Sequence, residues 1–279
     1  MSLRPGFAGL ILLLLSPGLS AQQPGAYLSD LTWPDAEQRF RDAPIVIVPF
    51  GAGAKEHGPH LPLGTDRIVL DWLLQVAVDS MPVIVAPSIL HGWFPAFRDF
   101  PGTDIADPAV FQQYALQVGE ALVRRGARRI VFLNTGISRS TGLPLAIAAR
   151  ELHASTHVPT LLVSWDDLET EETAAIAEQR DGGHADELET SIILVLRPEL
   201  VHMDRAVTDY QGGPAPAFPG YRPGGFSRTQ GDPDFSETGV FGDPRLASVD
   251  KGRRALAIMR TQWLKALRGF AAVPTVAPR

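Results

Sequence analysis

The feature that most constrains the fold is a strand pattern followed by a polar loop and then a helix pattern. The apolar, β-branched run Pro44–Phe50 predicts a buried strand. A loop rich in glycine and proline follows, and a helical pattern begins near Arg67. Ligands of open α/β sheets collect at the carboxyl ends of the strands. The loop over 55–66 is therefore the first place to look for chemistry.

The same alternation continues along the chain. Further strands are predicted at 81–87, 131–133 and 160–165, and helices at 67–80, 108–125 and 144–155. Strands that alternate with helices predict an α/β fold with a mostly parallel central sheet, helices on both faces and the site at the carboxyl edge. A content of 45% hydrophobic and 20% charged residues excludes a disordered chain.

The loop after the first strand carries candidate metal ligands. Glu56 and His57 are adjacent and Asp66 follows nine positions after His57, between glycines and prolines that favour a rigid backbone. Neutral imidazole together with carboxylate suits a divalent metal, Zn, Mn or Fe, and a carboxylate such as Asp66 can bridge two ions. The residues alone leave one or two ions open, and they also allow a solvated loop that binds no metal.

Several motifs in this order resemble the creatininase (creatinine amidohydrolase) family. They are the stretch His57 through Asp66, Phe100-Pro101-Gly102-Thr103, the strand that ends in Asn134, His184-Ala185-Asp186-Glu187-Leu188-Glu189-Thr190-Ser191, and Gly239-Val240-Phe241-Gly242-Asp243-Pro244. The resemblance implies the creatininase-like fold and hydrolysis of a C–N amide bond in a small amide, cyclic in some members. It also implies a homo-oligomer, in many relatives a ring-shaped hexamer.

The resemblance also implies roles for individual residues. It makes His57, Asp66 and Glu189 the ligands of one metal ion, with Glu56 as a further candidate ligand, and His184 the group that moves a proton. An apolar run after these residues predicts a helix whose first turn holds them. The positive end of a helix dipole would lower the pKa of His184.

Two positions depart from the family pattern. Lys55 stands where the family has a metal-binding Glu, and Gly136 stands where the family has a histidine ligand. One hypothesis is therefore a hydrolase with a single ion. The alternative is an inactive exported relative that binds a partner or has a structural role and keeps an incomplete metal site. Between them lies a third case, in which the Lys55 ammonium replaces the second cation.

The amino terminus has the pattern of a secretory signal. Arg4 precedes an apolar run from Phe7 to Leu15, which is too short to span a bilayer, and small residues end at Ala21. We expect residues 1–21 to be a cleaved signal peptide and 22–279 a single domain. The mature protein would then be periplasmic or secreted, without stable membrane insertion. The absence of cysteine suits that location.

Charge limits the class of partner. The formal net charge is −6, and no basic stripe with interleaved aromatic residues occurs, which argues against nucleic acid. Three further segments carry open expectations: the aromatic loop 91–97 as a pocket wall or a hydrophobic plug, an acidic helix from 166 through 178, and the Gly- and Pro-rich stretch 212–226 as a lid or subunit contact.

Overall fold

A five-stranded parallel sheet organises the protein, in the strand order β1-β3-β2-β4-β5. The computed structural model describes residues 24–42, 45–137, 140–210 and 236–275. Its strands are β1 (Ala26–Tyr27), β2 (Ile45–Phe50), β3 (Val83–Val85), β4 (Ile130–Asn134) and β5 (Thr160–Ser164). The predicted parallel α/β fold is confirmed. The two-residue β1 was not predicted, because so short a segment carries no recognisable pattern.

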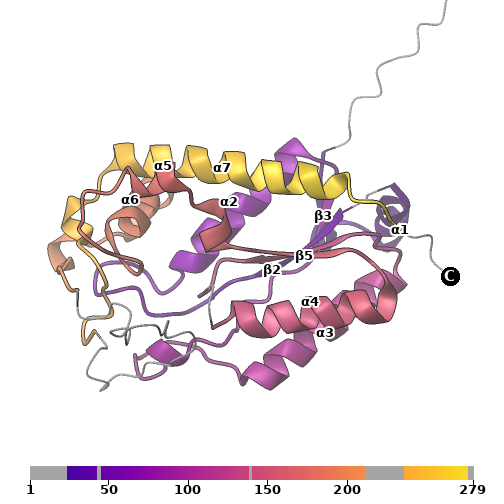
Figure 1. The fold of residues 1–279 in the computed structure, drawn as a ribbon, viewed down its shortest axis with the longest axis horizontal. Coiled ribbons are helices and arrows are strands. Elements are labelled where there is room, and N and C mark those ends of the chain that lie inside the picture. Colours follow the sequence, from indigo (N-terminus) through magenta and orange to yellow (C-terminus); the bar gives the residue numbers. More distant parts are fainter. Residues whose placement is uncertain (1–23, 43–44, 138–139, 211–235, 276–279) are drawn as a thin grey trace, which may run out of the picture.

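Helices cover both faces of the sheet (Figure 1). They are α1 (Trp33–Asp42), α2 (Thr65–Ser80), α3 (Pro108–Arg124), α4 (Gly142–Thr156), α5 (Glu171–Ala174), α6 (Glu187–Leu196) and α7 (Val249–Ala271). Alternate residues of β2 point to opposite faces, so Ile47 packs with the core that α2, α6 and α7 share, and Val48 packs with the core of α3 and α4. This two-sided burial explains why the strands are almost entirely apolar.

The carboxyl ends of β2, β4 and β5 are level. Phe50 pairs with Asn134 and Asn134 pairs with Ser164 in the parallel register. The loops that follow β2, β4 and β5 therefore leave the sheet at one edge, as the sequence predicts for the chemical loops.

Local signals set the helix boundaries. The Asp107 carboxylate accepts hydrogen bonds from the amides of Ala109 and Val110, and Pro108 occupies the first turn of α3. The acidic helix expected from 166 through 178 is wrong in its length. The chain forms only a short 3-10 turn (Trp165–Leu168) and α5. Beyond α5, the backbone amides of 178 and 179 donate to the Glu187 carboxylate, eight or nine positions further along the chain. A helical pattern in the sequence does not predict such an interaction.

No helix in the described part of the chain combines the length and the apolar character needed to cross a bilayer. The expected signal peptide 1–21 and the Gly- and Pro-rich stretch 212–226 lie outside the described residues.

Candidate metal centre

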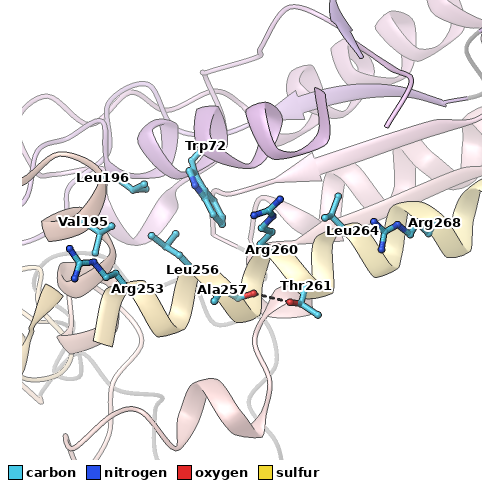
Figure 2. A pocket seen from close by; sticks show the side chains of 10 residues that line it. All are labelled: Trp72, Val195, Leu196, Arg253, Leu256, Ala257, Arg260, Thr261, Leu264 and Arg268. Atoms are coloured by element: carbon cyan, nitrogen blue, oxygen red, sulfur yellow. Dashed lines mark hydrogen bonds between the residues drawn. The ribbon is translucent and has the colours of Figure 1, made fainter. Parts of the chain in front are cut away.

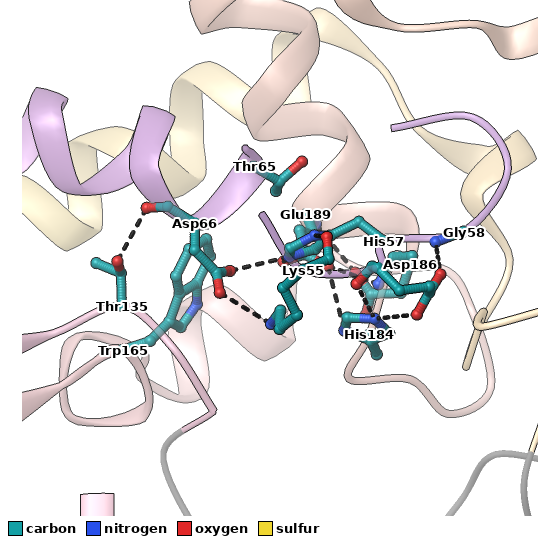
Figure 3. A network of polar contacts seen from close by, with 12 residues as sticks. Lys55, His57, Gly58, Thr65, Asp66, Thr135, Trp165, His184, Asp186 and Glu189 are labelled. Atoms are coloured by element: carbon teal, nitrogen blue, oxygen red, sulfur yellow. Dashed lines mark hydrogen bonds and ion pairs between the residues drawn. The ribbon is translucent and has the colours of Figure 1, made fainter. Parts of the chain in front are cut away.

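Two segments far apart in the sequence form the site (Figure 3). The loop after β2 supplies Lys55, Glu56 and His57, and the first turn of α2 supplies Asp66. The second segment supplies His184, just before α6, and Glu189, in its first turn. The sequence-predicted residues thus come together at the carboxyl edge of the sheet.

The His57 imidazole is fully buried and held in one orientation. Its Nδ1 lies 2.8 Å from the backbone oxygen of Lys55. A carbonyl oxygen only accepts, so Nδ1 carries a proton. Nε2 lies 2.9 Å from Asp66 Oδ1 and 3.5 Å from Glu189 Oε1. Nε2 can meet these oxygens in two ways, as a protonated donor or as an unprotonated ligand of a metal ion that the oxygens share.

The His184 imidazole is anchored through its other nitrogen. Nε2 donates to Glu56, with the backbone oxygen at 3.0 Å and the carboxylate Oε2 at 3.1 Å. Nδ1 then faces the Glu189 Oε2 atom, at 3.9 Å. The Phe97 ring stacks on the imidazole, with centroids 4.3 Å apart. Metal-ligating and proton-transferring histidines are commonly fixed in this way, by a hydrogen bond from the outer nitrogen.

The pKa of His184 corrects one expectation. Burial lowers it, but the hydrogen bond and the negative charge of Glu56 outweigh burial, so the pKa is raised above its ordinary value. The expected lowering by a helix dipole is wrong. The residue at the helix cap is Asp186, whose carboxylate accepts from the amides of Leu188 and Glu189, so His184 precedes the helix instead of sitting in its first turn.

The Glu189 carboxylate completes a group of possible ligands. Its Oε2 accepts from the amide of Ala185 at 2.5 Å, which leaves Oε1 directed at His57. One ligand atom each from His57, His184 and Glu189 lie within 4.8 Å of one another. Two imidazoles and a carboxylate are a donor set that suits Zn, Mn or Fe, so the residues fit a divalent ion.

The Asp66 carboxylate is divided between two partners. Its Oδ2 lies 2.9 Å from the Lys55 ammonium and its Oδ1 faces His57. Burial raises the pKa of Asp66, but the neighbouring Lys55 and His57 outweigh burial and bring it down to about 2. Asp66 is therefore ionised at neutral pH, and Lys55 has entered the site, as one of the three hypotheses supposed.

The Glu56 side chain does not point to solvent. It is 5% exposed, pairs with His184, and accepts a hydrogen bond from the amide of Gly58. It therefore orients His184 and lies outside the group of three ligand atoms. Gly239 lies against it, with a φ of +74° and room for no Cβ, since a Cβ would come within 1.9 Å of Glu56 Oε1.

The Gly136 position is tightly surrounded by side chains. A Cβ there would lie 3.1 Å from Phe94 and 3.2 Å from Asn134 Oδ1. Phe94 is fully buried, so its ring occupies the space beside the position where the resemblance leads one to expect a histidine. Of the two expectations for the aromatic loop, the fully buried Phe94 agrees with the hydrophobic plug, and Phe97 stacks on His184. The pocket wall stays a prediction.

His60 supports the loop instead of facing the ligand group. Its Nε2 lies 2.8 Å from the Thr190 hydroxyl, and its Nδ1 has no hydrogen-bond partner among the described residues. Burial lowers the pKa of His60 to about 4. His60 is accordingly neutral at pH 7.

Three features of the site were missed by reasoning from sequence: the stacking of Phe97 on His184, the close approach of Gly239 to Glu56, and Phe94 beside Gly136. Each joins residues that are distant along the chain. The only local signal was that glycine and aromatic residues occur close together in the sequence. This indicates turns and packing, but it does not predict which residues come into contact.

The described part of the chain also contains a groove of about 680 Å³ between α7, α6 and α2 (Figure 2). Arg253, Arg260 and Arg268 line it together with Trp72. It holds no histidine or carboxylate and shares no residue with the group of possible ligands. The chemistry of the side chains, and not the size of the cavity, therefore locates the candidate site.

Comparisons with known proteins agree on one family. The family model described as "Creatininase: Creatinine amidohydrolase" matches residues 29–267. A mycofactocin precursor peptide peptidase of Mycolicibacterium smegmatis is 27% identical, over 84% of this chain and 88% of the relative. A 3-dehydro-scyllo-inosose hydrolase of Thermotoga maritima is 26% identical, over 83% of this chain and 79% of the relative. A solved structure titled "Creatininase Mn" superposes with a TM-score of 0.73 at 25% identity, covering 89% of this chain and 100% of the other.

Proposed function

Because this chain belongs to the creatininase family, we propose that it is a metal-dependent hydrolase that cleaves a C–N amide bond of a small molecule. The observation that carries the proposal is the convergence of two carboxylate oxygens, from Asp66 and Glu189, on the buried Nε2 of His57. Imidazole nitrogen and carboxylate oxygen are the donors that a divalent ion binds, so an ion among the three groups accounts for this convergence.

We assign one divalent ion, Zn, Mn or Fe, to His57, Asp66 and Glu189, the ligands that the family resemblance implies; His57 and Glu189 also belong to the group whose ligand atoms lie within 4.8 Å of one another. When bound, such an ion would lower the pKa of water and polarise a carbonyl. Asp66 would offer Oδ1, because its Oδ2 pairs with Lys55. Glu189 would offer Oε1, because its Oε2 accepts from the Ala185 amide. Each carboxylate is thus fixed by its second oxygen.

His184 is the proton donor in this proposal. Glu56 raises the pKa of His184 above its ordinary value, which shifts the balance toward the imidazolium form. Its Nδ1 faces the ligand group while Nε2 stays bonded to Glu56. Delivery of a proton from Nδ1 to the leaving nitrogen is the step that amide cleavage requires, and a placed donor accelerates it roughly 100- to 10,000-fold.

The experiment measures metal content and turnover together. Protein purified without chelator is analysed by mass spectrometry for Zn, Mn and Fe, and assayed on creatinine, other cyclic amides, ureas, short peptides and 3-dehydro-scyllo-inosose. We expect bound metal, and turnover that disappears with chelator and returns with metal. In Glu189→Gln both should fall, whereas the exposed Glu151→Gln should change neither.

His184→Gln separates two roles for this residue. As a proton donor, its loss leaves the metal in place and lowers turnover by about two orders of magnitude or more. Loss of metal together with turnover would instead make His184 a ligand, which its position within 4.8 Å of the other two groups allows.

A second candidate function is an inactive relative that binds a partner. The presence of Lys55 in the site and of Phe94 beside Gly136 favours it. Protein that contains no metal, and that takes up none of the three ions after refolding in their presence, would support this candidate and refute the hydrolase.

We further propose that the protein is exported and assembles with copies of itself. The apolar run from Phe7 to Leu15 and the small residues up to Ala21 support export. The family resemblance supports assembly. Mass spectrometry of the mature amino terminus and light scattering of the purified protein test the two; an intact Met1 and a monomeric mass would refute them.

A further inference from the structure

We propose that the Lys55 ammonium is a built-in cation that takes the place of a second divalent ion beside Asp66, so that each chain binds a single ion. The limit to one ion rests on the metal site proposed above. The stabilising role of Lys55 in the metal-free protein does not, because it follows from burial and charge alone.

The position of Lys55 is unusual for a lysine. Its side chain is 4% exposed and that of Asp66 is 2% exposed, with Nζ and Oδ2 2.9 Å apart. Lysine is almost never so deeply buried unless its charge is paired. Asp66 in turn would be left as a buried, uncompensated carboxylate if the ammonium were absent.

The surroundings of the ammonium are poor in acceptors. Asp66 is the one carboxylate in contact with it within the described ranges. The Phe94 and Phe97 rings lie on its other sides, with centroids 6.0 Å and 5.7 Å from Nζ. Aromatic faces attract a cation but accept no strong hydrogen bond. The main electrostatic role of the Lys55 ammonium is therefore to compensate the charge of the buried Asp66 carboxylate.

The same geometry excludes a second ion. A carboxylate that bridges two ions offers one oxygen to each, but Asp66 Oδ2 already binds an ammonium. A divalent ion at that oxygen would lie against a like charge in a region of low dielectric. The space beside it at Gly136 is also narrow, because a Cβ there would lie 3.1 Å from Phe94. Lys55 therefore supplies the positive charge that a second ion would otherwise bring.

The first test measures the number of ions per chain. Wild-type protein, stripped with chelator and titrated with Zn²⁺ in a calorimeter, should bind about one ion. Lys55→Glu replaces the ammonium by a third carboxylate near His57, and it should bind about two. Binding of no more than one Zn²⁺ by Lys55→Glu, or of two by the wild type, would overturn the limit to one ion.

The second test uses metal-free protein and thermal unfolding. Lys55→Met leaves Asp66 buried without a counter-charge and should lower Tm on the order of 10 °C. Adding Asp66→Asn to Lys55→Met should restore most of the loss, because both charges are then gone. Zn²⁺ should raise the Tm of Lys55→Met by more than it raises that of the wild type.

Lys251→Met is the matched control, since Lys251 also pairs with a buried carboxylate, Glu187, but outside the site. It should lower Tm without any gain in the shift that Zn²⁺ produces. An unchanged Tm in metal-free Lys55→Met would overturn the role of Lys55. A wild type that binds no ion, with the Tm loss and its rescue by Asp66→Asn intact, would refute the proposed hydrolase and leave that role standing.

Discussion

Two lysines of this protein, the buried Lys55 and the partly buried Lys251, are paired with buried carboxylates but differ in their number of partners. Lys251 pairs with Glu187 where α6 meets α7, and Lys55 pairs with Asp66 in the candidate site. The exposed fractions are similar, 12% and 0% for the first pair and 4% and 2% for the second. Burial therefore does not distinguish them.

The number of partners does distinguish them. The Lys251 ammonium contacts Glu187, Glu178 Oε1 at 2.8 Å and the backbone oxygen of Leu246 at 2.9 Å, one acceptor for each N–H. Glu187 also accepts from two backbone amides. Burial lowers the pKa of Lys251, but Glu178 and Glu187 outweigh it and raise the pKa. The Lys251 ammonium therefore has all its hydrogen-bond acceptors within the protein, without an ion or a ligand.

The cluster around Lys55 is incomplete by comparison. Lys55 has one carboxylate partner in the described part of the chain, and the carboxylates of Asp66 and Glu189 both face the single Nε2 atom of His57. Polar groups left partly satisfied in a buried place are costly, so they persist where an ion or a substrate completes them. The comparison separates a pair that holds the fold from a cluster that awaits a ligand.

The largest effect is expected at the satisfied pair. Lys251→Met should lower the free energy of unfolding by roughly 3–5 kcal/mol, because the fully buried Glu187 carboxylate loses its counter-charge and keeps only its two backbone amide donors. Urea unfolding at pH 7 measures this. Lys265→Met, at an exposed lysine of the same helix, should change stability by no more than about 0.5 kcal/mol. A loss below about 1 kcal/mol in Lys251→Met would remove the contrast between the two pairs.

The sequence was informative wherever a local pattern decides the outcome. The helix expected from 108 to 125 is α3 (Pro108–Arg124), with the predicted Asp107 cap. The run Pro44–Phe50 contains β2 (Ile45–Phe50). Periodicity and capping act within a few residues, so one chain suffices to recognise them.

The contacts inside the site could not be predicted, because they join distant positions. Glu56 and His184 lie 128 positions apart, and their hydrogen bond reverses the expected direction of the His184 pKa shift. The direction in which Lys55 points depends on the placement of α2 and of the aromatic loop. The family resemblance named the residues, but only their packing shows which of them are satisfied.

The incomplete cluster should also respond to acid. Burial lowers the pKa of His60 to about 4 from 6.5, so the folded protein binds fewer protons than the unfolded chain between these values. The contribution of neutral His60 to the free energy of unfolding is present above pH 6.5 and is lost as pH falls toward 4. The total loss is about 3 kcal/mol. A proton on Nδ1 would find no acceptor, which is the structural cause.

The test compares metal-free wild type with His60→Gln by urea unfolding between pH 7 and pH 4. The wild type should lose about 3 kcal/mol more than the variant over this range. His153→Gln, at an exposed histidine of α4, should follow the wild type. If the free energy of unfolding of the wild type and of His60→Gln fell equally with pH, His60 would have all its hydrogen-bonding needs met, as Lys251 does. The contrast between the two regions would then not extend to His60.

The smallest effect sharpens the comparison at Glu56. Gly239→Ala places a Cβ against Glu56 Oε1 at a φ of +74°, so Glu56 must move and release His184. Loss of a group that orients a metal-site histidine typically lowers metal affinity about 10- to 100-fold, or about 1.4–2.8 kcal/mol. Gly64→Ala is the control, because its Cβ meets only a backbone oxygen at 3.7 Å and its φ is −84°. Calorimetric titration with Zn²⁺ should show the lower affinity in Gly239→Ala and not in Gly64→Ala. Equal affinity in both variants would mean that the Glu56–His184 contact stabilises the fold, as the Glu187–Lys251 pair does, and does not tune the metal site.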